Sequence, residues 1–161
     1  MYSRILAVLA ALALTTPLLA DVRIEARMER REHSMDSNST VEKFKVSGPT
    51  LRYEYNYSGY HPDPKFEREL TYRAWVDQGK IEKLLKDKGL LKNLSREFPA
   101  PKGEPDRREI LLELVIKLDG KTYTVRFHGA PGDALDADAD YANALLFLNQ
   151  LRTIAGEAAK E

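Results

Sequence analysis

The chain has 161 residues, with 25 basic and 25 acidic side chains and no cysteine. The absence of cysteine excludes a disulfide-stapled fold, a thiol nucleophile, a cysteine-ligated zinc site and a lipid-anchored lipoprotein. Balanced charge argues against a nucleic-acid partner and against binding to bulk anionic lipid, because both require a large positive surplus. We expect no nucleic-acid partner and no cofactor.

The start of the chain is organised like a secretory signal peptide. Arg4 supplies a positive charge, an apolar run occupies residues 5–14, and the small residue Ala20 precedes the expected cut. The apolar run is about half of the roughly 20 residues that span a bilayer. We therefore expect cleavage of residues 1–20 and a single domain at 21–161. We expect the mature protein to be an exported bacterial protein, located in the periplasm or outside the cell. We expect no insertion into the membrane after cleavage.

Alternating polar and apolar residues predict a sheet that is mainly antiparallel. The strand at 110–118 is aliphatic on both faces, so we expect it at the centre of the sheet. Asp119-Gly120 after it predicts a two-residue hairpin turn. The proline-bearing segment 95–106 is expected to be a linker. The other strands are expected at 22–29, 41–46, 51–57, 67–76 and 122–128.

Two segments have the spacing of amphipathic helices. Asp77 can cap the first of them, which carries Ile81, Leu84 and Leu85 on one face, and Gly89 can end it. The second is expected at about 141–155, where apolar residues recur at helical spacing. The order of elements predicts an α+β fold, an antiparallel sheet of about five to six strands with two helices packed on one face.

An acidic run before the second helix has the spacing that opens a calcium-binding loop, at Asp136, Asp138 and Asp140. The pattern fails at its sixth position, which is Tyr141 where a glycine is required, and at its twelfth, which is Phe147 where a glutamate is required. We expect these carboxylates to stabilise a helix N-terminus instead. No metal site is expected elsewhere.

The histidines provide one enzymatic hypothesis. His33, His61 and His128 are isolated from one another in the sequence, and no pair has metal-ligand spacing. A small hydrolase could use His61 or His128 with a carboxylate such as Glu54 or Asp77, provided that the two groups lie within hydrogen-bond distance. No catalytic residue is assigned.

Aromatic residues mark a candidate binding surface. Tyr53, Tyr55 and Tyr57 share one face of a predicted strand, whereas a tryptophan in the next strand points to the opposite face. The tyrosines form either part of the core or an exposed platform for a peptide, a glycan or a protein. A loop rich in glycine and proline follows them and must turn. The candidate binding residues are Tyr57, Tyr60, His61 and Trp75.

The chain from about residue 50 to 155 resembles the emfourin type of small protein inhibitor of thermolysin-like metalloproteases. The resemblance is carried by the extended pair before Asp77, the helix at 81–91, the strand ending Leu118-Asp119-Gly120-Lys121 with Tyr123-Thr124-Val125-Arg126-Phe127 after it, and the final leucine-rich helix. The chain departs from the family in its additional strands at 21–46, and in Ser47-Gly48-Pro49, which stands where the family has a glycine-pair turn. The resemblance implies inhibition of such a protease, and no inhibitory residue is transferred.

The leading hypothesis is a non-enzymatic, exported protein- or peptide-binding module. Its partner is expected to be another exported protein or peptide. A protease inhibitor and a small hydrolase are the alternatives, and the sequence leaves the oligomeric state open.

Overall fold

The computed structural model describes residues 21–33, 37–99 and 108–158. The predicted signal peptide at 1–20 lies outside the described residues. In the described part of the chain, no helix is long and apolar enough to cross a membrane.

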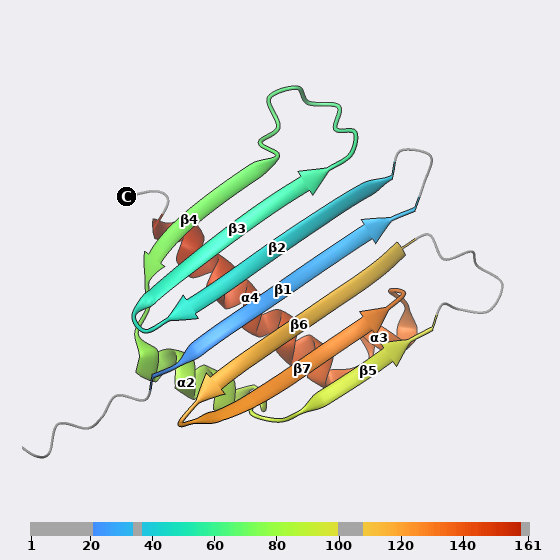
Figure 1. The fold of residues 1–161 in the computed structure, drawn as a ribbon. Helices are drawn as coiled ribbons and strands as arrows, with labels where there is room; N and C mark the ends of the chain where they lie inside the picture. Colours follow the sequence, from blue (N-terminus) through green and yellow to red (C-terminus); the bar gives the residue numbers. More distant parts are fainter. Residues whose placement is uncertain (1–20, 34–36, 100–107, 159–161) are drawn as a thin grey trace, which may run out of the picture.

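A seven-stranded sheet with the order β4-β3-β2-β1-β6-β7-β5 forms one layer (Figure 1). All neighbouring strands are antiparallel except β5 and β7, which are parallel. The α+β class and the antiparallel sheet are confirmed. The strands are β1 (Arg23–Glu32), β2 (Asn38–Ser47), β3 (Thr50–Ser58), β4 (Glu69–Trp75), β5 (Leu94–Phe98), β6 (Arg108–Leu118) and β7 (Lys121–Gly129), and the helices are α2 (Gln78–Asp87), α3 (Asp133–Asp136) and α4 (Ala139–Ala158).

The prediction of five to six strands and two helices requires correction, because the described residues form seven strands and three helices. The predicted linker at 95–106 contains most of β5, which has only Phe98 buried and therefore carries little alternation of its own. The additional helix, α3, is a single short turn. The strand at 110–118 is interior, between β1 and β7, but β1 occupies the centre of the order.

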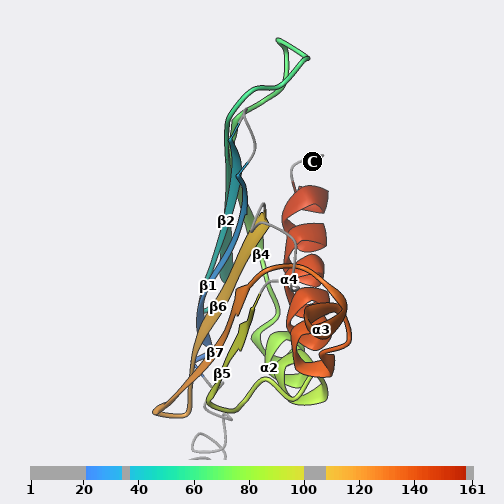
Figure 2. The ribbon, with the colours of Figure 1, turned by 90° about the vertical axis from the view of Figure 1, so that its right-hand side faces the viewer.

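The helices cover one face of the sheet and leave the other face open. Figure 2 shows α2, α3 and α4 on the same side of the strands. In Figure 1, α4 crosses the sheet obliquely and its C-terminal end lies behind β4. The molecule is therefore a two-layer structure in which every strand has one face toward the helices and one face toward solvent.

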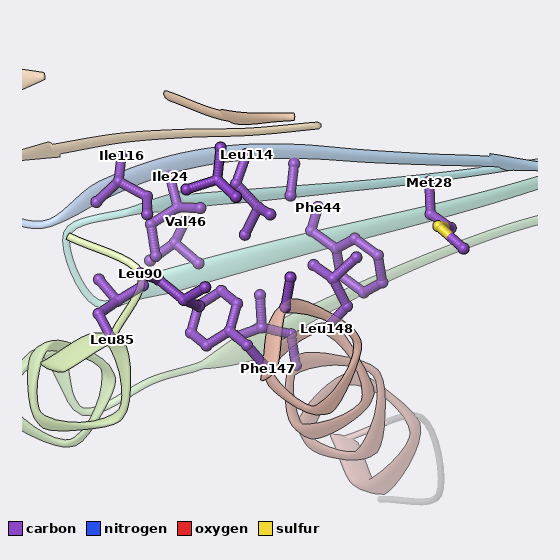
Figure 3. Packing of buried hydrophobic residues seen from close by; sticks show 14 of the residues in the cluster. Ile24, Met28, Phe44, Val46, Leu85, Leu90, Leu114, Ile116, Phe147 and Leu148 are labelled. Atoms are coloured by element: carbon purple, nitrogen blue, oxygen red, sulfur yellow. The ribbon is translucent and has the colours of Figure 1, made fainter. Parts of the chain in front are cut away.

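The hydrophobic core lies between these layers. Ile24 and Met28 of β1 and Phe44 of β2 are almost completely buried on the helix side. Phe147 and Leu148 of α4 point toward them from the other layer (Figure 3). Full burial of side chains of this kind stabilises by roughly 1.5–3 kcal/mol each. The alternation read from the sequence thus identifies the core face of the strands.

The predicted turns and caps are present. The Asp77 side chain accepts a hydrogen bond from the Lys80 amide at 3.1 Å, which satisfies one free donor at the start of α2. After this helix, Gly89 adopts a positive φ of 63°. Asp119 and Gly120 have φ values of 51° and 74°, as a tight β6–β7 hairpin requires.

Candidate functional site

The loop between β3 and β4, residues 59–68, is the most prominent projection of the described chain. It extends past the ends of the strands in Figure 1 and past the helix layer in Figure 2. It contains Gly59 with a φ of 134° and two prolines, which prevent a regular ladder. The chain therefore leaves the sheet here and returns to it at β4.

Hydrogen bonds hold the base of this loop closed. The Tyr57 hydroxyl donates to the Tyr60 carbonyl at 2.6 Å. The Arg68 guanidinium donates to the Gly59 carbonyl at 2.6 Å, and the Tyr57 amide donates to the Arg68 carbonyl at 2.7 Å. The two sides of the loop are thus joined by side-chain and main-chain contacts in addition to the strands below.

Aromatic rings fill the space inside the loop. The ring of His61 stacks on Phe66 with a centroid separation of 3.9 Å, and Tyr57 packs edge-on against Phe66 at 5.1 Å. The Asp63 amide donates to His61 Nδ1 at 3.2 Å. Stacked and edge-to-face arrangements of this kind stabilise by roughly 0.5–1.5 kcal/mol beyond the buried area. The loop is therefore ordered by its own side chains.

An exposed aromatic residue lies on this ordered loop. Tyr60 is 66% exposed, and both prolines, at positions 62 and 64, are exposed. The structure brings the predicted residues Tyr57, Tyr60 and His61 together here. Sequence reasoning missed Phe66 and Arg68, although an aromatic residue within a loop rich in proline was the signal for the first of them.

The strand tyrosines belong mainly to the core. Tyr53 is buried, and Tyr55 packs against the core from a partly exposed position. Burial, with a further contribution from the nearby carboxylate of Glu42, raises the pKa of Tyr53 to about 12. Of the three strand tyrosines, only Tyr57 contacts the projecting loop, and the platform interpretation does not apply to Tyr53.

Trp75 lies at the other end of β4 from the loop. It is 81% exposed and occupies the open face of the sheet, as its position in the alternation predicted. The length of β4 separates it from the loop by roughly 20 Å, at about 3.3 Å per residue. The structure therefore does not bring Trp75 together with Tyr57, Tyr60 and His61.

Charged residues dominate the open face of the sheet. One row of opposed residues crosses four neighbouring strands, from β3 through β2 and β1 to β6. It consists of Glu54, Lys43, Arg27 and Glu113. These residues line part of a shallow groove of about 410 Å³. The outer positions place Glu54 opposite Lys43 and Glu113 opposite Arg27, whereas Lys43 and Arg27 at the centre are both basic, and Arg27 also pairs with Glu29 of its own strand at 2.6 Å. The face is therefore a charged, hydrated surface rather than a contiguous apolar one.

A second polar cluster surrounds His128, which lies on the open face near the end of β7. Its Nε2 lies 2.5 Å from Glu109 Oε1 on β6, and its Nδ1 lies 2.7 Å from Glu97 Oε2 on β5. Arg31 and His33 also approach Glu109, at 3.9 and 3.8 Å. The imidazole thus connects the two strands that flank β7.

The geometry of this cluster determines the protonation of His128. Carboxylates accept hydrogen bonds, so both ring nitrogens must carry protons to satisfy both contacts. The hydrogen bond to Glu109, followed by that to Glu97, raises the pKa of His128. The hydrogen bond from His128 is the largest cause of the lowered pKa of Glu109. In this state the ring has no nitrogen free to accept a proton from a substrate.

The partners proposed for a hydrolase are located elsewhere. Glu54 pairs with Arg52 at 2.5 Å on the open face, and Asp77 caps α2. His61 contacts the loop residues and neither of these carboxylates among the described residues. The hydrolase hypothesis requires a histidine within hydrogen-bond distance of a carboxylate, and His128 has such contacts, but with Glu97 and Glu109 rather than with Glu54 or Asp77.

Two residues of the acidic run, Asp138 and Asp140, lie at the expected helix N-terminus, whereas Asp136 is the last residue of α3. Asp138 precedes α4 and accepts a hydrogen bond from the Tyr141 amide at 2.9 Å. Arg96 on β5 pairs with both Asp138 and Asp140, and Lys92 pairs with Asp140. Among the described residues, no group of three or more histidine, aspartate or glutamate side chains is placed to hold a metal ion.

No protein-family model and no curated protein matches this sequence.

Proposed function

We propose that this protein is an exported, non-enzymatic binding module that recognises another protein through the loop at 59–68. The observation that carries the proposal is the combination of Tyr60, 66% exposed, with a loop whose base and interior are held by hydrogen bonds and stacked rings. Export rests on the predicted signal peptide, and the expected partner is an exported protein or peptide.

Preorganisation is the physical reason why such a loop favours binding. A flexible loop loses conformational entropy when a partner orders it, which weakens the complex. Here the contacts of Tyr57, Phe66 and Arg68 restrict the loop in the absence of a partner. A tyrosine also provides a large contact area at a low entropic cost, because its side chain has only two rotatable angles.

The shape of the loop favours a concave partner. The loop is convex and extends beyond the strands and helices, so it can enter a cleft without a clash from the rest of the molecule (Figure 2). Projecting loops of antibody domains bind concave surfaces in the same way. The open face, with its paired charges, offers a less favourable surface because its ion pairs would have to lose water.

A comparison of loop variants tests the proposal. Residues 21–161 of the wild-type protein are immobilised and incubated with an extract of exported proteins, and the retained proteins are quantified by mass spectrometry. The Tyr60→Ala variant should lose a partner that the wild type retains, while its thermal unfolding midpoint remains unchanged. Binding of the same partner to purified wild-type protein should then be saturable.

Trp75→Ala is the matched control, since it removes an exposed aromatic residue at the end of β4 that is far from the loop. It should retain the partner. If Trp75→Ala abolishes binding and Tyr60→Ala does not, the loop is not the recognition surface. If the wild type retains no partner at high bait concentration, the binding function itself is contradicted.

Inhibition of a thermolysin-like metalloprotease is a second candidate function. It is supported by the resemblance and by the projecting loop, because the active site of a protease is a cleft. Stoichiometric addition of the protein should then reduce protease activity, and Tyr60→Ala should weaken the inhibition. Full protease activity in a large molar excess of the wild-type protein would exclude this candidate.

The hydrolase hypothesis has less support. His128 has both nitrogens occupied by carboxylates, and His61 approaches neither Glu54 nor Asp77 among the described contacts. The hydrolase hypothesis would be supported if the protein hydrolysed chromogenic esters or peptides and if His128→Gln or His61→Gln abolished this activity.

A further inference from the structure

The outer edge of β4 is free in the described sheet. β4 pairs only with β3, and it is the terminal strand on that side of the order. The α4 helix lies in the other layer, and Figure 2 shows it beside the sheet rather than in its plane. Free edges present unpaired amide and carbonyl groups that can pair with another strand.

The hydrogen-bond pattern identifies the residues that face outward along this edge. The Tyr57 amide donates to the Arg68 carbonyl at 2.7 Å, and the Val76 amide donates to the Pro49 carbonyl at 2.8 Å. In an antiparallel pair, alternate residues bond to the same neighbour. Even-numbered residues of β4 therefore bond to β3, and the amides of Glu69, Thr71, Arg73 and Trp75 point toward the free edge.

The same residues carry a self-complementary pattern of charge. If a second copy of β4 pairs antiparallel about Thr71, Glu69 lies opposite the partner's Arg73, and Arg73 lies opposite the partner's Glu69. Directly opposed side chains in such a pair have Cβ atoms about 4.5–5.5 Å apart, within reach of an ion pair. Neither residue has an ion-pair partner among the described residues, although Asn56 contacts Glu69 at 3.4 Å.

We infer that the β4 edge is an interaction surface for a second copy of this chain, which would form a two-fold symmetric dimer with a continuous sheet. Charges on an edge strand usually prevent pairing. On β4, two-fold antiparallel pairing places each acidic residue opposite a basic residue of the second copy, so the charges attract instead of repelling. Such isologous contacts are the commonest way in which identical chains associate.

The exposure of apolar side chains along β4 is consistent with this surface. Leu70 and Tyr72 face the helix layer but remain only partly buried. In the proposed register, Leu70 of each copy lies opposite the partner's Tyr72, so both gain cover. Trp75, 81% exposed, lies at the end of the same edge and would approach the segment that precedes β4 of the second copy.

Charge-swap variants of residues 21–161 test the dimer by sedimentation equilibrium over a wide concentration range. The wild type should associate reversibly to a dimer. Arg73→Glu and Glu69→Arg each place like charges at both ion-pair positions, so each should weaken the dimer by at least about tenfold. The double variant restores both pairs and should dimerise like the wild type, as should an equimolar mixture of the two single variants.

A main-chain variant separates edge pairing from other contacts. Thr71→Pro removes an amide that points to the free edge and leaves the bonds between β3 and β4 in place, so the fold should survive. It should be monomeric, whereas Thr71→Val, which keeps the amide, should dimerise. Circular dichroism verifies the fold, and the single tryptophan of the chain gives a second, concentration-dependent signal of association.

Three results would overturn the inference. The first is a wild type that remains monomeric at millimolar concentration. The second is a dimer that Arg73→Glu and Thr71→Pro leave unchanged, which would place the interface elsewhere. The third is failure of the equimolar mixture to associate although each single variant is folded. None of these measurements involves the partner bound by the loop at 59–68, so the two proposals succeed or fail separately.

Discussion

Arg152 on α4 donates two hydrogen bonds to Glu42 on β2, from Nε at 2.9 Å and from Nη2 at 2.5 Å to the same carboxylate oxygen. The two residues are 110 positions apart in the chain. Glu42 lies on the helix side of the sheet and is only 4% exposed. This ion pair therefore joins the two layers of the fold, and Arg30 and Tyr53 provide further donors to Glu42.

Substitution of Arg152 by alanine should lower the free energy of unfolding by about 2 kcal/mol. We expect a smaller loss of stability than the roughly 3–5 kcal/mol typical of a broken buried ion pair, because Arg30 still faces the Glu42 carboxylate. Glu42→Leu combined with Arg152→Leu should restore most of this stability, since no buried charge then remains unpaired. Urea denaturation checks both variants, and equal stability of the wild type and Arg152→Ala would show that the pair does not stabilise the fold.

The His128 cluster should make stability depend on pH. Hydrogen bonds to Glu109 and Glu97 raise the pKa of His128, so its contribution is fully present below the unfolded pKa, about 6.5, and is lost as the pH rises through the folded value. The pKa of Glu109 is lowered, chiefly by its hydrogen bond with His128, so its contribution is fully present above the unfolded pKa, about 4.3, and is lost as the pH falls through the lowered folded value. His128→Gln should therefore cost most between about pH 5 and 6.5.

The size of this effect is limited by solvent. The side chains of His128 and Glu109 are 33% and 34% exposed, so the cost should be about 1 kcal/mol or less. It should approach zero in alkaline solution. Unfolding curves of the wild type and His128→Gln at several pH values test this, and a difference that does not vary with pH would contradict the assignment of a charged imidazole.

Asp138 is expected to stabilise the start of α4. Its side chain caps the helix through the Tyr141 amide and pairs with Arg96, so Asp138→Ala should cost about 1–2 kcal/mol. Asp136→Ala is the matched control, because Asp136 is exposed and forms no side-chain hydrogen bond among the described residues. Thermal unfolding should distinguish them, and equal midpoints would show that the cap is dispensable.

Gly129 is expected to be irreplaceable at the end of β7. Its φ is 142°, and a Cβ atom placed there would lie 2.0 Å from the carbonyl oxygen of Phe98 on β5. Gly129→Ala should therefore cost more than about 2 kcal/mol and loosen the β5–β7 pair. Gly120→Ala, at a positive φ with open space around it, should cost about 1 kcal/mol. Chemical denaturation compares the two, and similar values would exclude close contact with β5.

Strands and helices were predicted correctly where the local pattern of apolar and polar residues was strong. β1 and β7 were evident because buried residues alternate with exposed ones over part of each strand, and α2 was evident from its cap and its following glycine. β5 was missed because its exposed middle residues resemble a linker, and its parallel pairing with β7 depends on a distant segment. The burial of Glu42 on the core face could not be predicted either, since a glutamate in a strand normally indicates a position that faces solvent.

The candidate site was predicted only in part. Tyr57, Tyr60 and His61 lie close together in the sequence, so a turn among prolines was sufficient to group them. Trp75 was also grouped with them, but the extended conformation of β4 carries it to the far end of the sheet. The carboxylates around His128 come from two other strands, and only the register of the sheet brings them to the imidazole.

The sequence by itself determined the class of fold, most element positions and the faces that are buried, because these depend on the local periodicity of apolar residues. It also determined the absence of cysteine chemistry. The tertiary structure alone decided which distant charges meet, as in the pairs Glu42 with Arg152 and His128 with Glu109, and which strand edge remains free. Those relationships depend on strand order and register, which arise from contacts between segments far apart in the chain and leave no periodic signal in either segment.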